Sequence, residues 1–92
     1  MAGFQYHGGR KILRQLRQRE NLDLRAEPDN PHDEFAVRIE RRGAMLGYVP
    51  RSDNHHIHRL ITQGARLACR IVEVDRKAPP WNRVRVEVVH TI

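Results

Sequence analysis

Short stretches of alternating apolar and polar residues, each ended by glycine or proline, constrain the fold of this chain most. Apolar side chains recur at every second position in residues 21–26, 35–40 and 84–88. This alternation is typical of half-buried strands, which have one face on a core and the other in solvent. The chain is therefore expected to be mainly β, with antiparallel strands joined by short turns.

Further strands are predicted between these three. Residues 3–7 form a short opening strand that Gly8 and Gly9 end. Residues 41–44 fit a hairpin turn in which Gly43 supplies a positive φ, so residues 45–49 are the return strand. Apolar residues fall at odd positions in 67–71 but at the even positions 72 and 74 afterwards. This change predicts a bulge or a sharp bend in the strand. Residues 78–82 are expected to form a loop.

Helical spacing is confined to two segments. Residues 11–19 are expected to form one or two turns of helix. A longer helix is predicted to run through Gln63, with Ser52 or Asp53 as its cap and Gly64 as its stop. Its buried stripe is expected to consist of Ile57, Leu60 and Ile61. About five or six strands with one or two helices favour a curled antiparallel sheet or small barrel, in a single domain over residues 1–92.

The charge of the chain favours a polyanionic partner. Seventeen Lys and Arg oppose eleven Asp and Glu, for a net charge of +6. Arginine binds phosphate through a planar fork of donors, so nucleic acid is the first expectation, and solubility alone is the alternative. The lone Cys69, the lack of an apolar run of membrane length and the lack of a signal-peptide core near the start favour a cytoplasmic protein without a membrane partner.

An acidic turn interrupts this basic chain. Pro28 and Pro31 fix the backbone and remove two amide donors between two strands, so regular pairing must stop there. Within seven residues the turn carries five hydrogen-bonding side chains, those of Glu27, Asp29, Asn30, His32 and Asp33. So many polar groups in one connector indicate a small, specific recognition site.

The ordered motifs of the chain resemble those of the HIRAN domain family. They are Gly3–Tyr6, the turn Glu27–Asp33, Ala36-Val37, the segment Leu46–Arg51 (Leu-Gly-Tyr-Val-Pro-Arg), and the helix closing on Gly64. The resemblance covers nearly the whole chain and is greatest to the short prokaryotic form that stands without a helicase. It implies an OB-like antiparallel β-barrel of about six strands with flanking helices.

The resemblance also implies a function: binding of single-stranded DNA at a free 3′-hydroxyl end, linked to DNA repair or stalled-fork processing, with DNA-processing proteins as further partners. Carried over by position, the DNA-binding roles fall on Tyr6, Asn30, His32, Asp33, Tyr48 and Arg51, with Gln5 and Trp81 as secondary candidates. Gln5, His32 and Tyr48 depart from the family pattern, and Trp81 matches by order alone.

The residue chemistry agrees with an end-binding role and leaves alternatives open. A carboxylate repels an internal phosphodiester but accepts a hydrogen bond from a free hydroxyl, which suits Asp33. Asn30 and Asp33 could instead cap the turn. Tyr6 and Tyr48 could be core rings, and Trp81 could pack over the end of the barrel.

Catalysis and cofactors are not expected. The sequence has no nucleophile-base arrangement in a known context and no phosphate-cradling glycine loop. The histidines at 55, 56 and 58 are expected on a polar helix surface rather than on a metal. The runner-up function is a protein-interaction or scaffolding domain that uses the same turn, and a metal-dependent nuclease is a distant third.

Overall fold

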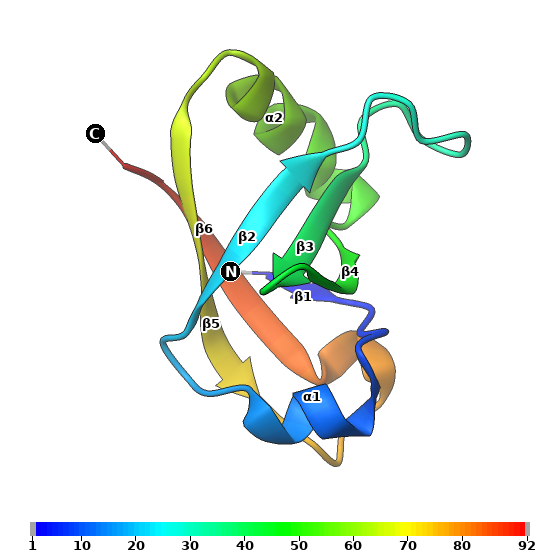
Figure 1. The fold of residues 1–92 in the computed structure, drawn as a ribbon, viewed down its shortest axis with the longest axis vertical. Helices are drawn as coiled ribbons and strands as arrows, with labels where there is room; N and C mark the ends of the chain where they lie inside the picture. The colour runs from blue at the N-terminus through cyan, green and yellow to red at the C-terminus, as the bar shows by residue number, and fades with distance from the viewer. Residues whose placement is uncertain (1, 92) are drawn as a thin grey trace.

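The computed structural model describes residues 2–91, and Met1 and Ile92 lie outside the described part (Figure 1). The strands are β1 (Ala2–Phe4), β2 (Asn21–Ala26), β3 (Val37–Arg41), β4 (Ala44–Tyr48), β5 (Arg66–Val74) and β6 (Val84–Thr91). The helices are α1 (Gly9–Gln15), α2 (Arg51–Thr62) and the short 3-10 helix η1 (Pro80–Asn82). The strands pair antiparallel in the order β1-β6-β5-β2-β3-β4, which confirms the predicted fold class.

The local turn chemistry explains the central hairpin. Arg42 and Gly43 have φ values of 51° and 84°, the pair of positive angles that a tight two-residue hairpin loop requires. Arg41 pairs directly with Ala44 across the turn. Strand β2 has the predicted bounds, whereas β3 begins at Val37 rather than Phe35 because Glu27 and Ala36 close the base of the preceding loop.

The two edges of the sheet approach each other and make a curled half-barrel. The backbone N–H of Tyr6 donates to Pro80 O (3.0 Å), and that of His7 donates to Leu46 O (2.7 Å). The predicted opening strand over residues 3–7 is therefore too long: the chain leaves β6 after Phe4 and crosses to β4. Gly47 makes this crossing feasible, because a Cβ there would lie only 2.5 Å from Gln5 O.

Strand β5 contains the predicted irregularity. Its register against β6 shifts between Ile71 and Glu73, so Val72 is the extra residue of a bulge. The bulge lets Cys69 and Ile71 on one side of it, and Val74 on the other, face the same core. Burial raises the pKa of the Cys69 thiol to about 12, so this side chain is an apolar core group at neutral pH.

Helix α2 begins earlier than predicted. Its first residue is Arg51, Pro50 precedes it, and no side chain caps it, so the prediction of a Ser52 or Asp53 cap is wrong. The Pro50 carbonyl instead accepts from the Asp53 amide at 2.9 Å and starts the first turn. The predicted stop at Gly64 is confirmed by its φ of 82°.

The buried face of α2 differs from the predicted apolar stripe. Asn54 and His58 are 2% and 7% exposed, whereas Ile57, Leu60 and Ile61 are only half-buried. The helix directs its polar residues at the loop between β2 and β3, where Asp33 accepts from Asn54 and Ala36 O lies 3.4 Å from His58 Nδ1. Polar partners in this loop therefore decide which side of α2 is buried.

The two helices lie at opposite ends of the long axis of the molecule (Figure 1). Helix α1 ends at Gln15, so the predicted helix over residues 11–19 is wrong in both bounds. Leu13 on the helix and Leu16 just after it are buried in the core. In residues 2–91 no helix is both long and apolar enough to cross a membrane. The loop of residues 27–36 projects from the barrel on the side where α2 begins (Figure 1).

Candidate nucleic-acid interface

The projecting loop is organised by its own side chains. The Asn30 Oδ1 accepts from the amides of His32 (2.9 Å) and Asp33 (3.1 Å), which closes a tight turn around Pro31. The Glu27 amide donates to Ala36 O at 2.9 Å and closes the base of the loop. Because Asn30 Oδ1 already accepts two hydrogen bonds, Asn30 has the turn-capping role that was the structural alternative to DNA contact.

Glu27 connects the loop to the sheet. Its Oε1 accepts from Asn30 Nδ2 (3.1 Å) and from the Tyr48 hydroxyl (2.8 Å), while its Oε2 lies 3.7 Å from Arg38 Nη1. Burial raises the pKa of Glu27, but the hydrogen bonds from Asn30 and Tyr48 and the charge of Arg38 outweigh it, so the pKa lies below its ordinary value. The loop is thus held by an ionised carboxylate with partners on three sides.

Asp33 lies where the loop meets α2. Its Oδ1 accepts from the Phe35 amide (2.9 Å), and its Oδ2 accepts from Asn54 Nδ2 (2.8 Å). Hydrogen bonding from the Phe35 amide lowers the pKa of Asp33; burial opposes this, and Asn54, Arg51 and His55 support it. The side chain is still 19% exposed, so the carboxylate is charged, fixed in orientation and open to solvent on one side.

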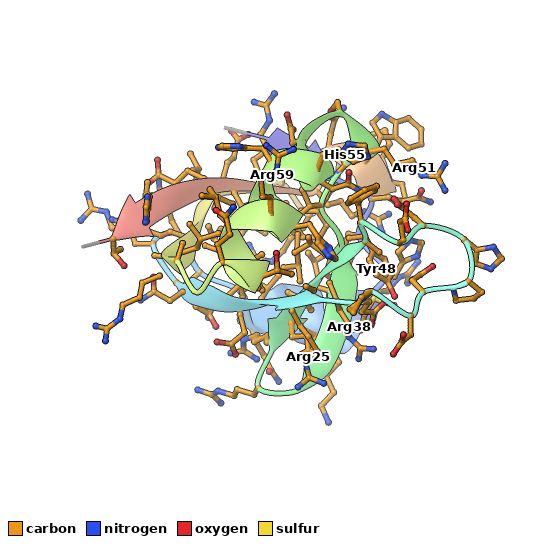
Figure 2. All side chains as sticks on the ribbon, turned by 90° about the horizontal axis from the view of Figure 1, so that it is seen from above. Arg25, Arg38, Tyr48, Arg51, His55 and Arg59 are labelled. Atoms are coloured by element: carbon orange, nitrogen blue, oxygen red, sulfur yellow. The ribbon has the colours of Figure 1, made fainter. Side chains whose placement is uncertain are left out.

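Arg51 provides an exposed cation beside this carboxylate. Its Nε lies 3.6 Å from Asp33 Oδ2, and its Nη2 donates to His32 O at 3.3 Å. The side chain is 77% exposed, so it retains free N–H donors. Figure 2 shows Arg51, at the start of α2, on the same side of the molecule as the loop.

Two adjoining hollows flank Arg51. The inner hollow, of about 330 Å³, is lined by Asn30, His32, Asp33, Ala36, Tyr48, Val49, Arg51 and Asn54. The outer hollow, of about 440 Å³, is lined by Gly3, Phe4, Gln5, His7, Tyr48, Val49, Pro50, Arg51 and Trp81. They share Tyr48, Val49 and Arg51, so a ligand can extend from one into the other.

The structure brings most of the predicted site residues together in these hollows. Asn30, His32, Asp33, Tyr48 and Arg51 line the inner hollow. Gln5 and Trp81 line the outer one, and Trp81 is 59% exposed rather than packed over the barrel.

Tyr6 is the exception among the predicted site residues. It is 5% exposed in the core, and its hydroxyl donates to Gly9 O at 2.7 Å. A ring buried in this way has no free face for a base, so Tyr6 is the core ring that was the alternative to a DNA contact.

Sequence reasoning missed two residues of the site. Glu27 was named among the polar side chains of the turn but was given no role, although its spacing of three from Asn30 is a signal of mutual contact within a turn. Asn54 had no comparable signal, because its burial depends on α2 beginning at Arg51. Asn54 Oδ1 is buried, and no group of residues 2–91 bonds to it. Asn54 therefore serves the site through its side-chain N–H, which donates to Asp33 Oδ2.

The histidines of α2 divide between surface and interior. His55 is exposed and lies against Phe35, with ring centroids 3.9 Å apart. His58 is buried, with Nδ1 3.4 Å from Ala36 O, so the prediction of a polar surface position is wrong for this residue. Across residues 2–91, no three His, Cys, Asp or Glu side chains form a group that could hold a metal ion.

The two tyrosines provide a test of this geometry. The hydrogen bond to Glu27, burial and the charge of Glu27 raise the pKa of Tyr48 against the opposing charge of Arg38. Burial raises the pKa of Tyr6, although the charges of Arg41 and Arg83 lower it in part. Both tyrosines are expected to titrate above 10.0 in an ultraviolet tyrosinate titration. Glu27→Gln should return one of the two midpoints towards 10.0 and leave the other raised; two unchanged midpoints would contradict the contact.

The molecule is thus a small β domain of half-barrel form. Its acidic, proline-containing loop and the exposed Arg51 line one hollow, an arrangement suited to binding a ligand. The chain belongs to the HIRAN domain family, whose sequence profile matches residues 1–92. HIRAN domains are DNA-binding modules and are not themselves catalytic.

Two crystal structures are similar to this one. A protein from Lactobacillus plantarum superimposes with a TM-score of 0.67 at 24% identity, over 84% of this chain and 82% of that one. The HIRAN domain of human HLTF superimposes with a TM-score of 0.66 at 16% identity, over 97% of this chain and 66% of that one. At these identities the likeness establishes the shared fold. A search of curated proteins finds no match.

Proposed function

We propose that this domain is a non-catalytic module that binds single-stranded DNA and prefers a free 3′-hydroxyl end, held in the inner hollow. The observation that carries the proposal is the pairing of Asp33 with Arg51. A charged, oriented and partly exposed carboxylate lies 3.6 Å from an arginine that is itself largely in solvent. Arg51 attracts a phosphate, and Asp33 excludes one from its own position.

The free acceptor capacity of Asp33 suits a terminal hydroxyl. A carboxylate offers about four acceptor positions. The Phe35 amide and the Asn54 side chain each occupy one, which leaves room for a ligand O–H on the exposed side. An internal phosphodiester at this position would bring a second negative charge against Asp33, so a continuous strand is disfavoured there.

Aromatic groups around the hollows supply surface for bases. Tyr48 lies between the two hollows, His32 lies on the rim of the inner one, and Trp81 lies on the outer one. Stacking on such rings contributes about 1–3 kcal/mol per base and tolerates any sequence. Gln5 adds an exposed amide to the outer hollow.

A preference for free 3′ ends places the domain with repair or stalled-fork processing, where such ends are handled. Its partners would then include DNA-processing proteins in the cytoplasm. Affinity for DNA is expected to weaken steeply as salt rises, since Arg51 and the excess of arginine act on phosphates. Binding to a protein partner need not show this dependence.

The test is a fluorescence titration of one short oligonucleotide that carries either a 3′-hydroxyl or a 3′-phosphate. The hydroxyl form is expected to bind roughly 10- to 100-fold more tightly, the range of one hydrogen bond to a charged group. The same oligonucleotide with a 5′-phosphate controls for added charge and should bind as tightly as its unmodified form. Equal affinity for the two 3′ ends would exclude end recognition.

A further inference from the structure

A basic cleft lies beyond the outer hollow, in a part of the fold that the proposed end site does not use. It has a volume of about 580 Å³ and is lined by Leu16, Arg17, Gln18, Val72, Glu73, Val74, Arg76 and Arg85. Three arginines face a single glutamate there, so the charged lining has a net positive charge. The cleft lies between the end of α1 and the outer face of β5 and β6.

Two of its arginines are held in place by the end of α1. Arg17 Nη1 donates to the carbonyls of Arg14 (2.8 Å) and Leu16 (3.1 Å), and Arg76 Nη2 donates to the same two oxygens at 3.2 Å. Each guanidinium is anchored through one nitrogen and retains donors on the others. Anchored arginines lose less freedom when they bind a phosphate than free side chains do.

The cleft and the outer hollow share no lining residue, but one strand, β6, separates their lining residues on β1 and β5. Arg85 is the register partner of Gly3 on one side and of Glu73 on the other. Gly3 lines the outer hollow; a Cβ at Gly3 would lie 2.9 Å from Trp81 O and 4.0 Å from Arg85 Cγ, so the Trp81 backbone covers Gly3 on the side where Arg85 lies. Adjacent strands are about 4.8 Å apart, so Gly3 and Glu73 are separated by about 10 Å, or roughly three stacked nucleotides.

We propose that a single strand whose 3′ end occupies the inner hollow continues through the outer hollow and past Trp81 into this cleft, where Arg17, Arg76 and Arg85 bind its backbone phosphates. The inference rests on the proposed function and extends it: the domain holds a segment of several nucleotides rather than an end alone. The exposed Trp81, which lines the outer hollow, lies on this path and offers its ring to a base there.

Another route would leave the inner hollow along α2. Arg51, His55 and Arg59 follow one another at spacings of four residues on that helix (Figure 2). The cleft route is favoured because the cleft is concave and gathers three arginines, two of them anchored. Arg59 therefore serves as a matched control, since it is an exposed arginine on the competing route.

The test measures affinity for oligothymidylates with a free 3′-hydroxyl, from about two to about eight nucleotides long, at several salt concentrations. Affinity of the unmodified protein should rise roughly tenfold once the strand reaches the cleft. Arg85→Gln should remove most of this gain and reduce the salt slope by about 0.7, the value of one phosphate contact on a single strand. It should leave the shortest oligonucleotide and the preference for a 3′-hydroxyl unchanged.

Two further variants make the result specific. Glu73→Gln removes the single acid of the cleft and the 3.6 Å ion pair with Arg85, so it should tighten binding of long strands only. Arg59→Gln should leave the length dependence intact. A loss of length dependence in Arg59→Gln but not in Arg85→Gln, or no length dependence at all, would overturn the cleft proposal while the end preference stands. Absence of binding at every length would overturn the proposed function as well.

Discussion

Replacing Asp33 by alanine is expected to abolish the preference for a 3′-hydroxyl over a 3′-phosphate. The ratio of the two affinities should fall from roughly 10- to 100-fold to about one, because the variant loses both the acceptor for the hydroxyl and the charge that repels phosphate. Salt-sensitive binding should persist through Arg51 and the other arginines. The measurement is the paired titration with the two 3′ ends.

Asp33→Asn separates recognition from turn stability. The side chain introduced there keeps an oxygen for the Phe35 amide, and its amide can donate to Asn54 Oδ1, which lacks a partner in the native protein. This variant should therefore fold and bind the 3′-phosphate form more tightly than the native protein does. If it folds and still prefers the hydroxyl, Asp33 is a turn cap and not the end reader.

Replacing Glu27 by alanine is expected to lower the free energy of unfolding by about 1.5–3 kcal/mol, the range for a hydrogen bond to a charged group. The change removes the acceptor for Asn30 and the Tyr48 hydroxyl, and the ion partner of Arg38. Because the loop loses its link to β3 and β4, DNA affinity should fall as well. Urea unfolding, followed by the titration with the 3′-hydroxyl oligonucleotide, measures both effects.

Glu34 offers a matched control in the same loop. Its side chain is exposed, and no hydrogen bond or ion pair involves it in residues 2–91. Glu34→Ala should leave stability nearly unchanged and should slightly strengthen DNA binding through the lost negative charge. Equal destabilisation by Glu27→Ala and Glu34→Ala would show that the contacts of Glu27 contribute nothing of their own.

The fold was predictable where local chemistry decides it. The alternation of residues 21–26 identifies β2 to the residue, and Gly43 and Gly64 adopt the left-handed conformations that their positions require. The parity change after Ile71 gave the bulge. The crossing of residues 5–7 to β4 was not predictable, since it depends on close packing at Gly47 between segments far apart in sequence.

The candidate site was predictable in its loop but not in its support. The polar residues of the turn and Arg51 do share a hollow. A core position for Tyr6 was one of the two alternatives that its sequence left open, and its hydroxyl contacts Gly9 only three residues away. The burial of His58 was not predictable, because its neighbour Ala36 lies 22 residues away in sequence. Asn54 faces the site because α2 begins at Arg51, earlier than the start predicted from a cap at Ser52 or Asp53.

The loop separates what must stay fixed from what can change. Both backbone groups of His32 make hydrogen bonds: its amide donates to Asn30 Oδ1, and its carbonyl accepts from Arg51 Nη2. Its side chain is exposed. The side chain can therefore be exchanged without altering the path of the chain. Position 32 is accordingly where new ligand preferences could evolve, or be engineered, on an unchanged framework.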